Sequence, residues 1–240
     1  MNYNDYEIKD FTQERSLSFN DSFAILMRKV YLWMAMALVI TGVTSYGVAS
    51  SPGLMQAILT NNALLWVLII AEFGLVFAIS AAINKLSLTT ATLLFVLYSV
   101  INGATLSVIF LVYTMESIAS VFFITAGTFG VMAFIGYTTK KDLTSLGKML
   151  FMALIGLIIA TLVNVFFIQS SGFSLIVSYV GVLIFVGLTA YDSQKIKQML
   201  LQAPDAGESA KKLALLGALT LYLDFINLFI YLLRIFGDRK

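Results

Sequence analysis

The sequence of 240 residues contains no cysteine and no histidine, and only two prolines. The absence of cysteine excludes disulfides, thiolate nucleophiles, iron–sulfur clusters and thiolate zinc sites. The absence of histidine excludes histidine-based triads, most transition-metal sites and the usual pH switch near neutrality. A proton-sensitive group in this chain therefore has to be a carboxylate or a lysine. Both prolines, Pro52 and Pro204, fall between apolar runs, which favours long uninterrupted helices.

Charge is also scarce, because only 12% of the residues are charged while 60% are hydrophobic and the mean hydropathy is +0.92. A soluble domain has about 25% charged and about 45–50% apolar residues. A chain this apolar cannot cover itself with polar surface, so the composition predicts a single integral membrane domain with the lipid bilayer as its solvent. The net charge of +2 is too small to indicate nucleic-acid binding, and we expect no nucleic-acid partner.

Seven apolar runs follow one another, each of about 20–25 residues and long enough to cross the hydrocarbon core as a helix. Because backbone N–H groups find no water there, helices are favoured and the sequence predicts an all-α membrane protein. The predicted spans are residues 30–49, 63–83, 88–112, 118–139, 149–168, 175–196 and 213–236. Residues 1–29 form a polar segment ahead of a membrane domain at 30–240, and no apolar region in that segment suggests a cleaved signal peptide.

The basic residues predict a cytoplasmic N-terminus. Of the 15 lysines and arginines, only Arg234, Arg239 and Lys240 would emerge on the other side, so 15 minus 3 leaves 12 on the cytoplasmic side. The loops expected outside, at residues 50–62, 114–117 and 169–174, contain no lysine or arginine. A seventh segment that enters the membrane and turns back would remove the exception. In a prokaryote the host membrane would be the inner membrane.

Three acidic residues fall at membrane depth: Glu72, Asp192 and Asp224. A charged side chain at the bilayer centre costs about 2.5–3.5 kcal/mol, so each should face the bundle interior or a water-filled cavity. Asp224 lies near the middle of the last span, and Asn227, three residues later, shares its helix face. The structural alternative is a protonated aspartic acid that bonds two helices together. Glu72 is expected either to line a cavity or to make a structural hydrogen bond.

Asp192 lies near the cytoplasmic end of the sixth span, where the structural alternative is a solvated side chain paired with Lys195. Asp192 and Asp224 would meet only if the last helix were offset or broken. If they meet in a dry site, both cannot be ionised at low cost. Such a pair either holds one proton or offers its oxygens to a hard cation such as Ca²⁺.

Three segments carry a family resemblance: residues 136–147, from Gly136 to Gly147; residues 190–197, Ala-Tyr-Asp-Ser-Gln-Lys-Ile-Lys; and residues 221–237, which contain Leu-Tyr-Leu-Asp-Phe-Ile-Asn. The start of the first span, Arg-Lys-Val-Tyr-Leu-Trp-Met at residues 28–34, is similar but less distinctive. On these segments the chain resembles the transmembrane Bax inhibitor motif (Bax inhibitor-1-like) family, from about residue 20 to its end.

The resemblance implies a bundle in which six helices surround a central seventh, and a pH-dependent calcium leak with two paired aspartates near the cytoplasmic side. Those aspartates correspond to Asp192 and Asp224, and the acidic position of the second span corresponds to Glu72. Bacterial members are expected to carry an arginine that latches onto the pair. The corresponding residue here is Ile83, and the nearest base is Lys85, a candidate substitute although a flexible ammonium is not equivalent to a guanidinium.

The leading hypothesis is a passive, pH-gated cation pathway for Ca²⁺, with protons as the signal that the gate senses, without enzymatic activity and without a cofactor. Asp192 and Asp224 form the sensor and tentative Ca²⁺ site, Glu72 lines the route, and Asn227 and Tyr222 are expected to support the pair. The alternative is a non-conducting regulator that binds a membrane protease or a cell-death factor through the N-terminal segment and the loop at 197–212.

Two further classes fit the residues less well. An aspartyl intramembrane protease is expected to carry Gly-x-Gly-Asp at its second aspartate, whereas residues 221–224 read Leu-Tyr-Leu-Asp. A retinal protein needs a Schiff-base lysine, which the predicted seventh span does not contain.

Overall fold

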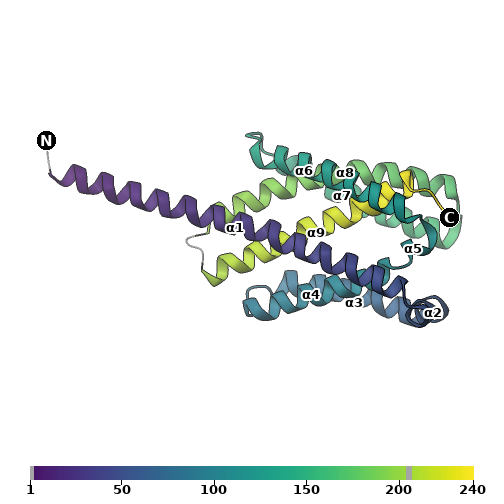
Figure 1. The fold of residues 1–240 in the computed structure, drawn as a ribbon. Coiled ribbons are helices and arrows are strands. Elements are labelled where there is room, and N and C mark those ends of the chain that lie inside the picture. The colour runs from purple at the N-terminus through teal and green to yellow at the C-terminus, as the bar shows by residue number, and fades with distance from the viewer. Residues whose placement is uncertain (1–2, 204–206) are drawn as a thin grey trace.

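The computed structural model describes residues 3–203 and 207–240, with side chains from residue 21 onward, and its regular elements are helices (Figure 1). Seven segments are long and apolar enough to cross a membrane, which confirms the predicted number and the all-α class. The helices are α1 (Tyr3–Ala49), α2 (Pro52–Thr60), α3 (Asn62–Ala82), α4 (Leu88–Leu106), α5 (Ile109–Val112), α6 (Met115–Thr138), α7 (Thr144–Val163), the π-helical turn η1 (Asn164–Ile168), α8 (Ser171–Leu201) and α9 (Glu208–Phe236).

Several helices are longer than the apolar runs that predicted them. Apart from α1, which is described below, the largest differences are at α8, which starts four residues before and ends five residues after the predicted span at 175–196, and at α7 and α9, which each start five residues early. The ends of a helix are set by capping groups rather than by hydropathy. At α8, the Ser170 hydroxyl accepts the backbone N–H of Phe173, so the helix begins within a polar stretch.

One helix was not predicted at all. The expected outer loop at 50–62 contains α2, whose first residue, Pro52, suits the first turn of a helix because it needs no N–H partner there. Nine residues are too few to be recognised as a span. From Tyr3 onward the predicted polar segment is helical, because α1 runs continuously from Tyr3 to Ala49, and its first part projects beyond the bundle (Figure 1).

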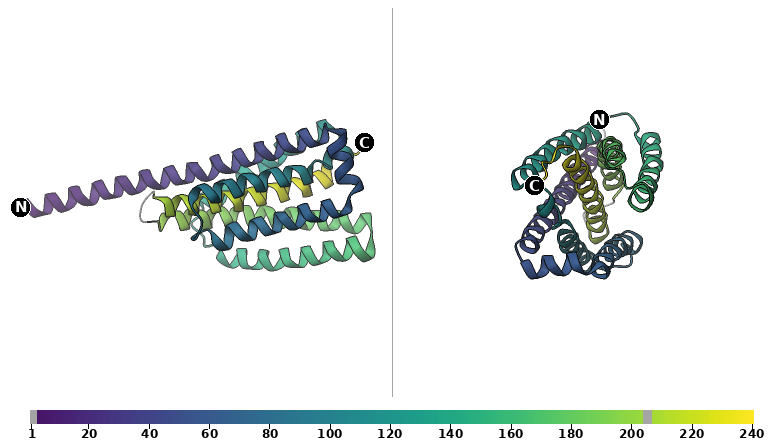
Figure 2. Two further views of the ribbon diagram at one scale, coloured as in Figure 1. Left: turned by 90° about the horizontal axis from the view of Figure 1, so that it is seen from below. Right: turned by 90° about the vertical axis from the view of Figure 1, so that its right-hand side faces the viewer.

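Helix α9 forms the core of the bundle, as the view along the helices shows (Figure 2). In its most apolar stretch 67% of the residues are buried, against 6% in α3. Helix α9 packs mainly against α8, α1, α6 and α4, whereas α3 packs against α4 and α7 packs against α8. The last helix is therefore central, with α3 and α7 on the outside of the bundle.

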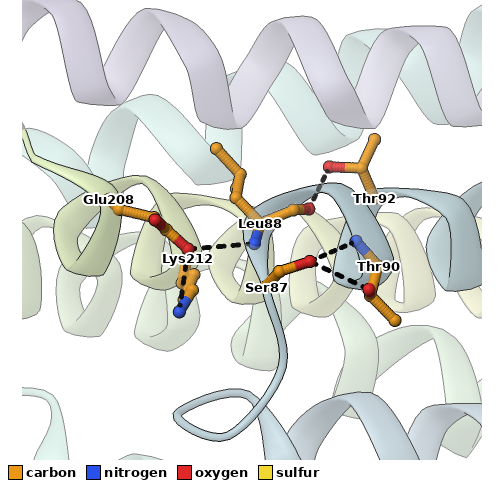
Figure 3. Close-up of polar contacts among 6 residues, drawn as sticks. All are labelled: Ser87, Leu88, Thr90, Thr92, Glu208 and Lys212. Carbon is orange, nitrogen blue, oxygen red and sulfur yellow. Dashed lines mark hydrogen bonds and ion pairs between the residues drawn. The ribbon is translucent and has the colours of Figure 1, made fainter.

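The end of the bundle from which α1 projects also holds the α3–α4 and α6–α7 connections and the start of α9 (Figure 1). We call it the basic end because these segments carry Lys85, Lys140, Lys141, Lys211 and Lys212. Here the start of α9 is joined to the start of α4. Glu208 Oε1 accepts the backbone N–H of Leu88 at 3.2 Å and pairs with Lys212 at 3.1 Å, as Figure 3 shows.

The C-terminus lies at the opposite end of the bundle (Figure 1). The backbone N–H of Thr114 donates to the Asp238 carbonyl at 3.1 Å, and the N–H of Lys240 donates to the Val112 carbonyl at 3.0 Å. Helix α9 thus runs unbroken from the basic end to the far end, and its basic tail is held there.

Candidate functional site

A cavity of about 1020 Å³ lies among α3, α4, α7, α8 and α9. Its charged lining residues are Glu72, Asp192 and Asp224, together with Lys148 and Lys195. All three acidic residues that the sequence placed at membrane depth therefore line one cavity, although they come from three different helices.

The carboxyl groups of Asp192 and Asp224 are in hydrogen-bonding contact. Both side chains are buried, with exposed fractions of 8% and 5%. They meet because α9 is offset rather than broken: it begins at Glu208 and is continuous through Asp224. Among the described residues Asp224 Oδ2 has no hydrogen-bond partner. Carboxylate oxygens only accept hydrogen bonds, so the pair has a donor between its two groups only when one carboxyl carries a proton.

Two glycines allow α6 and α7 to approach α8 next to this pair. A Cβ atom at Gly136 would overlap the backbone of Ala190, and one at Gly147 would lie 2.5 Å from the ring of Tyr191. Residues 190 and 191 directly precede Asp192 in the chain. The two glycines of the 136–147 segment thus fix the position of the helix that carries this aspartate.

Hydrogen bonds hold the next turn of α8 to the α6–α7 connection. Gln194 Nε2 donates to the Lys141 carbonyl and Gln194 Oε1 accepts from the Leu143 N–H, both at 2.8 Å. The Ser193 hydroxyl donates to the Ala133 carbonyl at 2.8 Å. The segments at 136–147 and 190–197, far apart in sequence, therefore form one structural unit around Asp192.

Glu72 faces the cavity from α3. Its carboxyl group lies beside the side chains of Asn102 and Thr105 of α4, and its Oε1 is buried without a hydrogen-bond partner among the described residues. Glu72 therefore lies on the cavity wall next to polar side chains of α4.

Tyr222 does not lie where we expected it. Its side chain is fully buried, and its hydroxyl lies 2.6 Å from Thr41 Oγ1 and 2.9 Å from Asn102 Oδ1. Thr41 is in turn 3.0 Å from the carbonyl of Ser99. Tyr222 is not among the residues lining the cavity, so it joins α1, α4 and α9 instead of supporting the aspartate pair.

Asn227 lines the cavity, and its amide donates to the Leu223 carbonyl of the same helix at 2.8 Å.

Lys85 is exposed in the α3–α4 connection and does not line the cavity, and Ile83 is buried. The structure therefore does not bring Lys85 to the aspartates. The lysines that line the cavity are Lys148 and Lys195. The sequence indicated only Lys195 as a neighbour of the site, because it follows Asp192 by three residues, and it did not indicate Lys148.

The two carboxyl groups of the pair offer few oxygens to a hard cation. Within residues 3–203 and 207–240, no three acidic side chains are placed to hold one metal ion. Two carboxylates alone fall short of the six to eight oxygens that Ca²⁺ takes.

Comparison with known proteins places these residues in a family context. The family model "Inhibitor of apoptosis-promoting Bax1" matches residues 24–240. The chain is 53% identical over 215 residues to the "Inner membrane protein YbhL" of Escherichia coli, covering 89% of this chain and 92% of that protein. It is 47% identical over 232 residues to a protein of Borreliella burgdorferi, covering 96% of this chain and 98% of that protein. A protein of Rickettsia prowazekii is 40% identical over 236 residues, or 98% of this chain and 99% of the relative.

Proposed function

This chain belongs to the Bax inhibitor-1 family, and from that premise we propose that it is a pH-sensitive calcium-leak channel. The observation that carries the proposal is the buried contact between Asp192 and Asp224 on the wall of a large cavity. We also propose that the channel lies in the inner membrane, like the E. coli relative according to its name. The basic end of the bundle would then lie in the cytoplasm.

The pair senses protons through its own hydrogen bond. When one carboxyl is protonated, the proton joins Asp192 to Asp224 and fixes α8 against α9. When the proton leaves, two negative charges face each other, and a divalent cation or water must take the place of the proton. Proton occupancy and Ca²⁺ passage are thereby linked at one site, with neither a cofactor nor a chemical reaction.

The other charged groups that line the cavity are Lys195 from α8, Lys148 from α7 and Glu72 from α3, whereas α4 contributes the uncharged Tyr98 and Asn102. The lysines add positive charge toward the basic end, and Glu72 adds a carboxylate on the opposite wall. Glu72 is therefore the next ligand along the route for a cation that leaves the pair.

The test is Ca²⁺ flux into proteoliposomes that contain the purified protein, measured between pH 6 and pH 8. We expect a flux above that of empty liposomes that changes across this interval. The double variant Asp192→Asn, Asp224→Asn keeps the hydrogen-bonding shape of the pair but removes both titrating groups, so its flux should not vary with pH. No flux above the empty control would overturn the channel proposal, and a preserved pH profile in the double variant would overturn the sensor.

A second candidate function, a membrane regulator that binds a partner protein such as a membrane protease, is favoured by the part of α1 that projects beyond the bundle (Figure 1). Deletion of residues 1–20 separates the two functions. A channel retains its Ca²⁺ flux after the deletion, whereas a regulator that uses this segment loses its partner in co-purification.

A further inference from the structure

We propose that the cavity also binds a lipophilic ammonium ion, with its N–H group at Asp224 and Glu72 and its apolar part between α3 and α7. This site goes beyond the proposed Ca²⁺ leak, because its ligand is an organic cation that stays bound rather than an ion that passes. Three observations support the proposal. Two buried carboxyl oxygens in the cavity have no hydrogen-bond donor among the described residues, aromatic side chains line the cavity, and its side at α3 and α7 is exposed to the lipid.

The acceptors lie on the cavity wall. Asp224 is only 5% exposed, and its Oδ2 has no hydrogen-bond partner among the described residues. The Oε1 atom of Glu72, which lines the same cavity, is also buried without a hydrogen-bond partner among the described residues. A buried acceptor without a donor is costly, so a ligand that brings an N–H group gains affinity there.

The walls of the cavity suit the apolar part of such a ligand. Phe73, Tyr98 and Phe151 line it, and Phe185 stacks on Tyr231 with ring centroids 5.9 Å apart. Aromatic faces attract cations as well as apolar groups. The volume of about 1020 Å³ is also comparable to sites for small organic ligands, which span roughly 300–1,000 Å³.

The direction of access selects a lipophilic ligand over a hydrophilic one. The cavity residues Phe73 of α3 and Met152 of α7 are 74% and 66% exposed, on outer helices that the bilayer surrounds. From the basic end, the cavity is flanked by the charged side chains of Lys148 and Lys195, which do not suit a hydrocarbon tail. A cation with a hydrocarbon tail can instead enter between α3 and α7 from the membrane.

The experiment measures equilibrium binding of radiolabelled dodecylamine, whose primary ammonium carries three N–H donors, to the full chain in lipid nanodiscs at pH 7.5, with empty nanodiscs as background. We expect saturable binding, with no competition from dodecanol, which has the same tail and no charge. The variant Glu72→Gln, Asp224→Asn should lower the affinity by about tenfold or more, which corresponds to about 1.4 kcal/mol. Phe73→Ala, a change on an exposed face, should lower it several-fold.

The matched control is Glu208→Gln, which removes an acid outside the cavity and should bind like the wild type. No saturable binding above background would overturn the site, as would equal competition by dodecanol or unchanged affinity in both cavity variants. If the acid double variant does not fold, the Phe73→Ala result decides. Because no Ca²⁺ flux is measured, a protein that conducts but does not bind the amine overturns this inference and leaves the proposed function standing.

Discussion

Tyr222 and Asp224 lie two residues apart on α9, yet their side chains lie in opposite surroundings. Two residues turn a helix by about 200°, so the two side chains point to opposite faces. Tyr222 faces α1 and α4, where its hydroxyl lies within hydrogen-bonding distance of Thr41 and Asn102. Asp224 faces the cavity, and one of its oxygens has no partner among the described residues.

The difference separates a structural polar group from a functional one. A buried polar group that is fully bonded stabilises one arrangement of its helices and has nothing left to offer a ligand. A buried carboxyl oxygen without a donor is costly to maintain, and we propose that a proton, a cation or a ligand fills this place on the cavity wall. Tyr222 therefore joins the helices of the bundle, whereas Asp224 keeps one acceptor without a partner among the described residues.

Glu72 tests where the boundary between the two regions lies, because it lies beside Asn102 and Thr105 of α4 and also lines the cavity, with an oxygen that has no partner among the described residues. We expect Glu72→Gln to leave the packing against α4 intact but to lower Ca²⁺ flux several-fold, since the proposed route loses one of its carboxylates. The pH profile should keep its shape, because the aspartate pair is intact. Flux in proteoliposomes measures both effects, and an unchanged flux would place Glu72 with the structural group.

Tyr222→Phe tests the structural side of the comparison. The change removes one hydroxyl and leaves Asn102 Oδ1 and Thr41 Oγ1 without that partner, which should cost about 1–3 kcal/mol of stability. The thermal midpoint of the purified protein should fall, whereas the pH response of the Ca²⁺ flux should persist. A variant with wild-type stability and a lost pH response would mean that Tyr222 belongs to the sensor after all.

Asp142→Asn should have the smallest effect and serves as the matched control for the pair. Hydrogen bonds from Thr144, including one from its backbone N–H at 2.9 Å, hold the pKa of Asp142 below its ordinary value of 3.8. The stabilising contribution of this carboxylate is therefore present above that value and is lost only as the pH falls through the lower folded pKa. Between pH 6 and pH 8 the variant should show wild-type flux and a wild-type pH profile, and a change there would indicate that the assay reports a general effect of lost carboxylates.

The sequence predicted the number of spans and the acidic residues of the site, because both depend on local composition. Twenty apolar residues in a row have few alternatives to a membrane helix, and a carboxyl at that depth has few alternatives to the bundle interior. The early starts of α7, α8 and α9 were not predictable from hydropathy, since capping and packing extend a helix into polar stretches. The offset of α9, which brings Asp224 to Asp192, depends on such an extension.

The partners of each polar side chain were the least predictable part. Tyr222 lies beside Asp224 in sequence, but the helical turn sends it to Thr41, a residue 181 positions away. Gly136 and Gly147 were recognised only as part of a motif, and their physical reason, close approach to Ala190 and Tyr191, requires the packed helices. A single sequence indicates which face a residue occupies more readily than which helix it meets.

The most direct test of the central claim compares Ca²⁺ flux from pH 6 to pH 8 in Asp192→Asn, in Asp224→Asn and in the double variant. If the two carboxyls hold one proton as a unit, each single change removes the pH response as completely as the double change, because effects within one unit do not add. If each single variant removes only its own part of the response and the two parts sum to the double effect, the aspartates act independently and the account of a shared proton is contradicted.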